Sequence, residues 1–290
     1  MTLSRREFGA LSMGTLLASA ALPVWAQEAP IRIGAVDPYS GAMAQYGDEV
    51  TRCYELAVNA ANASGGVLGR QIEIVRGNAT SPQEALGAVE PLIGRDNCDL
   101  LVGTYVSAIS NAASEAALNY DKLYWETNAL AISLIQRGLP NYVRAGASSN
   151  QFAERSVQGV TDIVAARLGK AATDLSVWIE HGDSAYGTSI MEEQVRLFRE
   201  AGLEPGVGTH SAKAIDVTDS VLRAQSAAPD VWITVGYVGD TNLLLRAAAI
   251  RASNLPRSCS RAPATPPKRW RRLARSIWRA SCWYPTRAPM

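Results

Sequence analysis

The sequence lacks the short motifs that mark the common enzyme active sites. It contains no Gly-x-Ser-x-Gly nucleophile turn, no Gly-x-x-x-x-Gly-Lys-Ser/Thr phosphate loop, no His-Glu-x-x-His metal motif, and no Gly-x-Gly-x-x-Gly after its first predicted strand. Histidine occurs only twice. We interpret His181 as a polar loop residue, because only its neighbours Asp183 and Ser184 hint at a catalytic triad, and His210 as solvent-facing at a strand end. No catalytic residue, metal ligand or cofactor is predicted.

Acidic residues are missing from one part of the chain. Residues 1–250 carry all 27 Asp and Glu and 18 of the 28 Lys and Arg, a net charge of −9, whereas residues 251–290 carry ten basic residues and no acidic one. The acidic body does not favour nucleic acid as a partner. A length of 290 residues is sufficient for two domains, and a chain with 47% hydrophobic and 19% charged residues is typically globular.

The one notable hydrophobic run near the start is short. It extends from Leu11 to Leu22, too few residues to span a bilayer, between Ser4-Arg5-Arg6-Glu7-Phe8 and Val24-Trp25-Ala26. A charged start, a short apolar stretch and a small residue at the exit predict a signal peptide over residues 1–26, cleaved near Ala26. The paired arginines resemble the twin-arginine export signal, which implies the twin-arginine translocase as a partner and the periplasm as the destination.

Cysteine is scarce as well. None of the four cysteines has the spacing of a zinc site, so structural zinc is not predicted. Cys53 and Cys98 could form a disulfide in an oxidising periplasm. Export of an already folded chain from a reducing compartment instead favours two buried free thiols.

From residue 31 onward, short apolar strands alternate with helical patterns. Strands are predicted at 31–36, 71–75, 99–103, 123–125, 142–144, 175–180, 204–210 and 231–235. Helices are predicted at 48–63, 81–94, 109–119, 151–168, 189–201, 217–227 and 243–252. This alternation predicts an α/β fold with doubly wound parallel sheets in two lobes, residues 27–146 and an incomplete second lobe, 147–253.

The loops that follow the predicted strands have a shared composition. They are rich in Gly, Ser, Thr, Asn and Tyr and poor in His, Cys and Lys; they cover residues 37–47, 104–108, 126–130, 181–187 and 236–241. Ligands of open parallel sheets bind beyond the carboxyl ends of the strands. The loops therefore predict a site that binds a small molecule without changing it chemically.

Several stretches, in a fixed order, resemble one family. They include Ile31-Arg-Ile-Gly-Ala-Val36, Ala60-Ala-Asn-Ala-Ser-Gly-Gly-Val-Leu-Gly-Arg70, Asp99-Leu-Leu-Val-Gly-Thr-Tyr-Val-Ser107 and Trp125-Glu-Thr-Asn-Ala129. With these, residues 31 to about 253 resemble the branched-chain amino-acid-binding family of periplasmic solute receptors. The resemblance implies a type I periplasmic binding fold, in which two doubly wound lobes close on a ligand.

The resemblance also implies a set of ligand-binding residues. It assigns tyrosines of both lobes to the cleft, a serine at a helix start to a ligand carboxylate, and a loop to backbone and side-chain polar contacts. A helix start suits a carboxylate because its N–H groups are unpaired and its dipole end is positive. In that order the residues are Tyr46, Tyr186 and Tyr237, then Ser107, then Asn128, Ala129 and Leu130.

Two departures from the family pattern leave the ligand open. Leu130 stands where the amino-acid receptors carry a threonine hydroxyl, and the acidic residue expected for an α-ammonium group falls where the resemblance stops. The solute could therefore be an amino acid, an amide, a urea-like compound or an aromatic acid.

Residues 254–290 look unlike the rest of the chain. They are rich in Arg, Trp, Pro and Ser and hold three of the seven tryptophans. A basic segment for nucleic acid or membrane is one interpretation. We favour a frameshift, because the alternate frame from Arg261 permits the loop, helix and strand that the family has next. It also permits a tyrosine where the amino-acid receptors have a glutamate, which favours a solute without a free α-ammonium group.

The function predicted from these features is capture of a solute for an inner-membrane ABC permease. Two alternatives stay open. The same cleft could serve as the ligand-sensing domain of a signalling system. An exported enzyme is disfavoured, because the sequence carries no cofactor motif.

Overall fold

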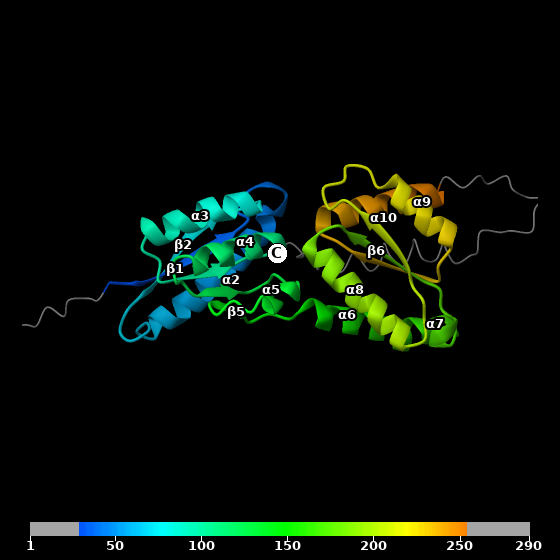
Figure 1. Ribbon diagram of the computed structural model, residues 1–290, viewed down its shortest axis with the longest axis horizontal. Helices are drawn as coiled ribbons and strands as arrows, with labels where there is room; N and C mark the ends of the chain where they lie inside the picture. The colour runs from blue at the N-terminus through cyan, green and yellow to red at the C-terminus, as the bar shows by residue number, and fades with distance from the viewer. Residues whose placement is uncertain (1–28, 254–290) are drawn as a thin grey trace, which may run out of the picture.

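Strands and helices alternate along residues 29–253, the part of the chain that this computed structural model describes. They form two α/β lobes that lie side by side along the long axis of the molecule (Figure 1). The predicted signal peptide over residues 1–26 and the tail of residues 254–290, with the predicted alternate frame from Arg261, lie outside the described residues.

The first lobe is built on a five-stranded sheet whose paired strands are all parallel, in the order β2-β1-β3-β4-β5. The strands are β1 (Ile31–Asp37), β2 (Ile72–Asn78), β3 (Leu100–Gly103), β4 (Tyr124–Glu126) and β5 (Tyr142–Arg144). Parallel strands need crossover connections, and the helices between them supply these. The carboxyl ends of the strands therefore share one edge of the sheet, which faces the second lobe (Figure 1).

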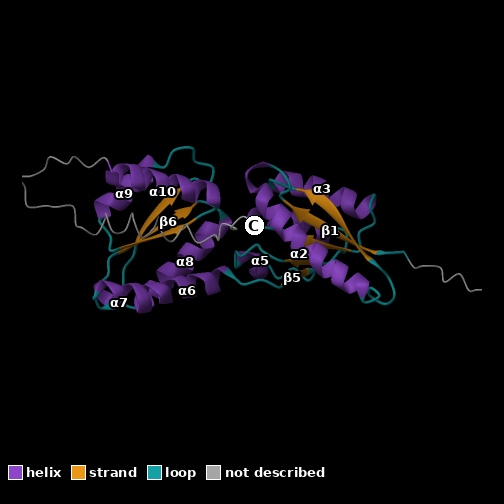
Figure 2. Ribbon diagram, turned by 180° about the vertical axis from the view of Figure 1, so that it is seen from behind, coloured by secondary structure: helices purple, strands orange, loops and turns teal. Residues whose placement is uncertain are grey.

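Helices cover both faces of the first sheet. They are η1 (Gly41–Met43), α2 (Ala44–Ala63), α3 (Pro82–Gly94), α4 (Ser107–Leu118) and α5 (Ser133–Gln136). The buried faces of α3 and α4 meet Val36, Leu101 and Tyr124 in the core of the lobe. On the other face, α2 runs across the sheet (Figure 2).

The second lobe has a smaller parallel sheet of three strands, in the order β7-β6-β8. The strands are β6 (Val177–Gly182), β7 (Gly206–His210) and β8 (Val231–Val235). The helices are α6 (Ser149–Gln158), the π-helix η2 (Gly159–Val164), α7 (Ala165–Leu168), η3 (Ala172–Asp174), α8 (Ala185–Glu200), α9 (Thr218–Ala227) and α10 (Val238–Ser253).

Alternation along β6 separates two environments in the second lobe. Val177 and Ile179 pack in the core formed with α6 and α8. Trp178 and Glu180 point to the opposite face, since successive side chains of a strand alternate, and that face is covered by α9 and α10. Glu180 is thus buried on the side of the sheet that carries α10.

The order and type of the strands and longer helices agree with the predictions, and the main differences are at helix starts. Helix α3 begins as predicted, with the Ser81 hydroxyl accepting the N–H of Glu84 at 3.2 Å and Pro82 in the first turn. Helices α2 and α8 each begin four residues before their predicted starts, at Ala44 and Ala185. Their first turns do not carry the apolar periodicity of a core-facing helix, because they border the space between the lobes.

Both cysteines of the described part are free thiols, and only one is buried. Cys98 packs in the core of the first lobe, as predicted. Cys53 is exposed on α2, so the prediction of two buried thiols was wrong for this residue. A cysteine at an outer position of an amphipathic helix is not distinguished from a buried one by its residue type alone.

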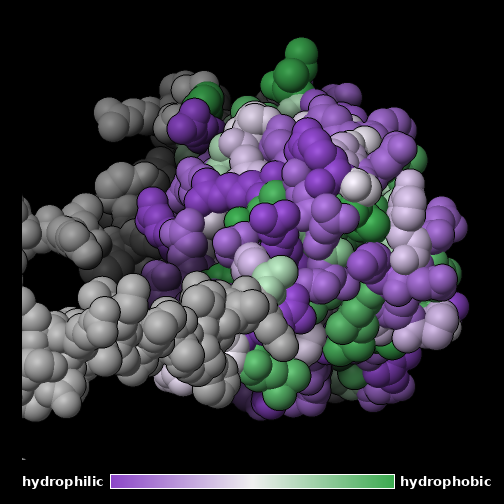
Figure 3. All heavy atoms as spheres, turned by 90° about the vertical axis from the view of Figure 1, so that its left-hand side faces the viewer, coloured by the Kyte–Doolittle hydropathy of each residue, from purple (hydrophilic) through white to green (hydrophobic). Residues whose placement is uncertain are grey.

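The outer surface of the first lobe is mixed in polarity. Figure 3, which looks onto its free end, shows hydrophilic residues over most of that face with hydrophobic residues between them. Between residues 29 and 253, none of the helices combines the length and hydropathy that crossing a bilayer would require.

Candidate functional site

A cavity of about 560 Å³ lies between the two lobes. Its walls come from segments that follow β1, β3, β4 and β5 in the first lobe and β6 and β8 in the second, together with α6 and α10. The lining residues are Tyr46, Tyr105, Thr127, Asn128, Leu130, Ala147, Phe152, Tyr186, Gly236, Tyr237, Val238, Thr241, Asn242 and Leu245. This position, beyond the carboxyl ends of parallel strands, is where open α/β sheets bind ligands.

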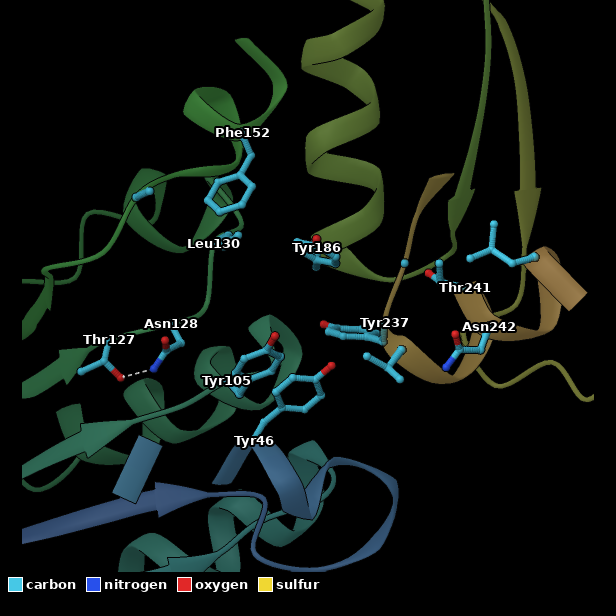
Figure 4. A pocket seen from close by; sticks show the side chains of 14 residues that line it. Tyr46, Tyr105, Thr127, Asn128, Leu130, Phe152, Tyr186, Tyr237, Thr241 and Asn242 are labelled. Atoms are coloured by element: carbon cyan, nitrogen blue, oxygen red, sulfur yellow. Dashed lines mark hydrogen bonds between the residues drawn. The ribbon is translucent and has the colours of Figure 1, made fainter. Parts of the chain in front are cut away.

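Two pairs of tyrosine rings dominate the cavity. Tyr46 and Tyr105 are stacked, with ring centroids 4.2 Å apart and an interplanar angle of 15°. In the second lobe, the rings of Tyr186 and Tyr237 are 5.2 Å apart and tilted by 32°. Figure 4 shows that the two pairs approach each other from opposite lobes, with the Tyr237 hydroxyl directed toward the first pair. The site thus has aromatic faces and phenolic hydroxyls from both lobes.

A Tyr-Gly dipeptide places one tyrosine of each pair. Tyr46 and Tyr186 lie in the first turns of α2 and α8, and each is followed by a glycine. A Cβ on Gly47 would lie 2.4 Å from the carbonyl oxygen of Pro38, and a Cβ on Gly187 would lie 2.3 Å from that of Gly182. Only glycine permits each helix to start so close to the preceding loop or strand, and this close approach fixes where the tyrosine stands.

The remaining polar lining is neutral. Thr127 and Asn128 face the cavity from the first lobe, and the Asn128 amide donates to Thr127 Oγ1 at 2.8 Å (Figure 4). Thr241 and Asn242 lie on the opposite wall, at the start of α10. Burial raises the pKa of Tyr237 well above its usual range, so its hydroxyl stays protonated at neutral pH. Of the described residues that line the cavity, none is Asp, Glu, Lys, Arg or His.

Five of the seven residues predicted to bind ligand line the cavity, and two lie behind its wall. The five are Tyr46, Asn128, Leu130, Tyr186 and Tyr237. Ser107 is only 2% exposed, and its hydroxyl accepts the Ala131 N–H at 3.3 Å. Ala129 is fully buried. Contact of these seven residues with a ligand stays a prediction.

Several lining residues were not among the seven predicted ligand contacts. Tyr105 lies in the predicted ligand loop 104–108, directly after the buried strand β3, but was not singled out. Phe152 lies in α6, and helical periodicity does not reveal which exposed position borders another lobe. Thr241 lies in the predicted ligand loop 236–241 but was not singled out. Asn242 lies just beyond that loop, and α10 carries both residues on its first turns because it begins at Val238, five residues before its predicted start.

A fully buried carboxyl group supports the loop at residues 127–130. Glu126 Oε1 accepts the N–H groups of Thr127, Asn128 and Ala129, each at 2.8 Å. Its Oε2 accepts the Thr104 N–H at 2.9 Å and contacts the Ser110 hydroxyl. Burial raises the pKa of Glu126 to about 8, although these hydrogen bonds act in the opposite direction. One side chain thus ties together the two loops that follow β3 and β4.

A second buried carboxyl group, Asp37, ends β1. Among residues 29–253 neither of its carboxylate oxygens has a hydrogen-bond partner of good geometry, although the Tyr39 and Tyr54 hydroxyls are near enough to lower its pKa in part. Burial has the larger effect and raises the pKa of Asp37 to about 7. The Tyr54 hydroxyl is also 3.0 Å from Thr127 Oγ1, which joins this group to the cavity wall.

We expect the substitution Asp37→Asn to stabilise the protein at pH 8 and to have little effect at pH 4. Folding raises the pKa of Asp37 from 3.8 to about 7, so the folded protein is most stable while this carboxyl group is protonated. The stability falls as the pH rises above 3.8, and the loss is complete once the pH has passed about 7. Asparagine cannot ionise. We expect a gain of about 2 kcal/mol at pH 8, less than the roughly 4 kcal/mol of the full shift, because a folded structure relaxes around a charge.

Urea unfolding followed by circular dichroism at both pH values measures this difference. Asp121→Asn is the matched control, because Asp121 is exposed in a turn. A variant of Asp37 that is less stable than the native protein at pH 8 would show that the carboxylate is satisfied in the folded state.

The structure corrects the interpretation of both histidines. His181 belongs to β6, is 4% exposed, and has its Nε2 2.8 Å from Thr209 Oγ1. His210 ends β7 as predicted, but it is 6% exposed and lies between two carboxylates rather than in solvent. The prediction failed because α9 and α10 cover this end of the sheet. In the stretch that the structure describes, no cluster of His, Cys, Asp and Glu is arranged to hold a metal ion.

A sequence model of one protein family, described as "Periplasmic binding protein", matches residues 30–265. The chain belongs to the periplasmic binding protein family. Among curated relatives, the Leu/Ile/Val-binding protein homolog 7 of Brucella suis biovar 1 (strain 1330) is 35% identical over 240 residues, 82% of this chain and 59% of the relative. Homolog 8 of the same organism is 33% identical over 249 residues, 86% of this chain and 61% of the relative. The chain therefore spans about three fifths of the length of these relatives.

Solved structures of periplasmic binding proteins share the fold. The substrate-binding protein LivJ of a branched-chain amino acid transporter from Streptococcus pneumoniae, in complex with isoleucine, aligns with a TM-score of 0.66 at 21% identity, covering 76% of this chain and 61% of that one. An ABC transporter solute-binding protein from Rhodopseudomonas palustris BisB5, in complex with 3,4-dihydroxybenzoic acid, aligns with a TM-score of 0.66 at 19% identity, covering 78% and 59%. These likenesses support the predicted type I periplasmic binding fold.

Proposed function

We propose that this protein is a solute-binding receptor that holds a small polar molecule between its lobes. The observation that carries this proposal is the cavity itself, because both sheets direct the carboxyl ends of their strands toward it and both lobes contribute its walls. A ligand that contacts both walls stabilises the arrangement in which the lobes face each other. The site needs no chemical step for that task.

We propose that the ligand lies among the two tyrosine pairs. The flat rings of Tyr46 and Tyr237 present π faces or edges, and their hydroxyls and the Asn128 amide can pair with polar groups of a solute. Leu130 and Tyr186 complete the enclosure. Aromatic walls with a few convergent polar groups are typical of pockets that orient a small organic ligand.

Ser107 and Ala129 complete the proposed site from behind the loop. The Ser107 hydroxyl holds the N–H of Ala131, and the N–H of Ala129 is held by Glu126. Both contacts shape the segment that carries Asn128 and Leu130. In this proposal the start of α4 also presents its N–H groups toward an acidic or carbonyl group of the ligand.

We propose a flat polar solute without a free α-ammonium group, such as an aromatic acid, an amide or a urea-like compound. An ammonium group enclosed in such a cavity is best met by a carboxylate, because a buried cation without an anionic partner is costly. The described lining offers tyrosine rings and neutral amides and hydroxyls instead. The ligand in the Rhodopseudomonas palustris protein, 3,4-dihydroxybenzoic acid, has this character, whereas the isoleucine in the Streptococcus pneumoniae protein does not.

We further propose that the protein works in the periplasm and delivers its solute to an inner-membrane ABC permease. Support for the location comes from the family and from the signal-peptide pattern of residues 1–26. The twin-arginine pair in that pattern supports export through the twin-arginine translocase.

A ligand panel tests the proposed function. We expect benzoate, 4-hydroxybenzoate or benzamide to raise the melting temperature of the protein, because a ligand that binds only the folded state stabilises it by about 2.7 kcal/mol at a concentration of 100 Kd. Isoleucine and acetate serve as comparison compounds. Differential scanning fluorimetry gives the shift, and titration calorimetry gives the affinity.

Each result has a distinct meaning. A rise in melting temperature with isoleucine alone would support the receptor function and overturn the proposed ligand class. Chemical conversion of a bound compound, detected by mass spectrometry, would favour an enzyme. No shift with any member of an extended panel of small solutes would contradict the receptor function.

A further inference from the structure

A buried charged cluster lies behind the cavity wall of the second lobe. His210 Nδ1 of β7 is 3.3 Å from Glu180 Oε1 of β6, and its Nε2 is 3.2 Å from Asp240 Oδ2 of α10. All three side chains are buried. Each ring nitrogen faces a carboxylate oxygen, so both must donate, which only the protonated imidazolium can do. The Glu180–His210–Asp240 cluster thus joins three separate elements through one positive charge.

The groups around the cluster leave His210 as its central cation. Glu180 Oε2 accepts the indole N–H of Trp178 at 3.1 Å. Arg223 of α9 reaches within 3.9 Å of Glu180 Oε1, but its side chain is 48% exposed. His181, the nearest other titratable group on β6, has its Nε2 directed at the Thr209 hydroxyl instead. A buried pair of carboxylates without an adjacent cation would be strongly destabilising, so the charge of His210 matters to this fold.

Close backbone approaches show that the cluster has a dedicated space. A Cβ on Gly208 would lie 2.0 Å from Glu180 Oε2, and a Cβ on Gly236 would lie 2.6 Å from Asp240 Oδ2. Both glycines therefore make room for a carboxylate. Gly236 also lines the cavity, so only a single backbone segment separates Asp240 from the ligand space at this point.

The first turn of α10 carries the cluster on one side and the cavity wall on the other. Asp240 Oδ1 accepts the N–H of Thr241 at 2.9 Å, while its Oδ2 faces His210. The side chains of Tyr237, Thr241 and Asn242 lie around the cavity (Figure 4). A movement of Asp240 away from β7 would therefore displace the second-lobe wall.

Titration of His210 falls in an accessible range. Burial alone would lower its pKa, but hydrogen bonds and charges from Asp240 and Glu180 raise it to about 9. The stabilisation of the fold by the charged His210 is complete below pH 6.5, the ordinary pKa of histidine, and is lost as the pH rises through about 9. Burial, and to a lesser degree the charge of Asp240, raises the pKa of both Tyr186 and Tyr237, so these phenols stay protonated through this window.

We propose that His210 is a positioning residue whose charge ties the first turn of α10 to β6 and β7 and thereby sets where Tyr237 stands in the cavity. Loss of that charge releases the turn and moves the second-lobe wall. Ligand affinity then depends on the protonation of a residue that does not touch the ligand. This last consequence rests on the proposed function, whereas the movement of position 237 does not.

Fluorine NMR of the ligand-free protein tests the positioning directly. With 4-fluorophenylalanine incorporated at position 237, we expect the ¹⁹F resonance to shift with a midpoint near pH 9, matching the titration of the His210 imidazole protons. The same label at position 120, an exposed ring in the turn after α4, is the matched control and should not follow that titration. A resonance at 237 that stays constant, or that moves together with 120, overturns the proposal.

Asp240→Asn separates the proposed link from a general effect of pH. The variant keeps the shape of the side chain and removes one of the two charges that hold the proton, so the midpoint of His210 should fall. We expect the midpoint at position 237 to fall by the same amount. If the His210 midpoint falls and that of 237 does not, the turn is not controlled through His210. If Asp240→Asn does not fold, the native protein labelled at position 237 still tests the proposal by itself.

Affinity supplies the functional measurement. For benzoate or benzamide, neither of which changes charge between pH 7 and 10, we expect Kd to be roughly five- to tenfold weaker at pH 10 than at pH 7, at the lower end of typical couplings between linked groups. This loss should follow the midpoint of His210 in both proteins. A pH-independent Kd with a normal ¹⁹F titration overturns the link to binding. An absence of binding at every pH contradicts the proposed function and leaves the fluorine result standing.

Discussion

Truncation of Glu126 to alanine is expected to cost about 4 kcal/mol or more of the free energy of unfolding. The substitution removes the acceptor of four backbone N–H groups: those of Thr104 and Ala129, which are buried, and those of Thr127 and Asn128, which are partly buried. An unsatisfied buried donor costs about 1–3 kcal/mol, and water entering the vacated space recovers only part of this loss. The loops after β3 and β4 should loosen together, because one carboxyl group joins them.

Glutamine at the same position is a graded second variant. Burial favours the neutral acid form of Glu126 at pH 7, and glutamine resembles that form. Its amide oxygen can still accept hydrogen bonds from the three N–H groups of residues 127–129. Its NH₂ group would face the Thr104 N–H, and two donors cannot pair. We therefore expect Glu126→Gln to cost about 1–3 kcal/mol, clearly less than alanine.

Urea unfolding at pH 7 measures both costs. Glu90→Gln on the exposed side of α3 is the control and should stay within about 0.5 kcal/mol of the native protein. If alanine costs no more than glutamine at position 126, the N–H groups find other partners. The loop would then not depend on this side chain.

The arrangement of the elements was accessible from the sequence, because alternation of short apolar strands with helical periodicity has few other solutions. The location of the cavity followed from the same argument. Tyr46, Tyr186 and Tyr237 lie in or beside loops after strands, and all three line it. What the pattern missed were the first turns of α2, α8 and α10, since a helix start that borders a cavity lacks the apolar spacing of a core-facing turn.

The buried charged groups were not accessible in the same way. Asp37, Glu126 and His210 each end a strand, where a polar residue is ordinarily interpreted as the beginning of a solvated loop. Their burial is a consequence of tertiary packing, in which helices and neighbouring loops close over the carboxyl ends of the sheets. Sequence spacing gives no measure of that closure, so the prediction for His210 was wrong and the role of Glu126 was not foreseen.

Binding should be most sensitive to the tyrosine that the second lobe contributes just before α10. We expect Tyr237→Ala to weaken the affinity for the compound with the largest thermal shift by about 2–3 kcal/mol, which corresponds to roughly 30- to 150-fold in Kd. The variant removes the ring that pairs with Tyr186 and the hydroxyl that points toward the first lobe. Tyr237→Phe keeps the ring and loses only the hydroxyl, so about 1 kcal/mol is expected. Titration calorimetry at pH 7 measures both.

Two further variants distinguish a loss of affinity at the cavity wall from a loss caused by its supporting residues or by any change at the surface. Tyr120→Ala removes a partly exposed ring in the turn after α4 and should leave Kd unchanged. Ser107→Ala removes the hydroxyl that holds the Ala131 N–H and that the family resemblance assigns to a ligand carboxylate. A ligand contact there predicts a loss of about 1–3 kcal/mol in affinity for benzoate but less for benzamide, because hydrogen bonds to charged groups are stronger. Equal losses for the two compounds would mean that Ser107 acts only through the loop. For the tyrosine variant, an unchanged Kd in Tyr237→Ala would place the ligand outside the cavity between the tyrosine pairs.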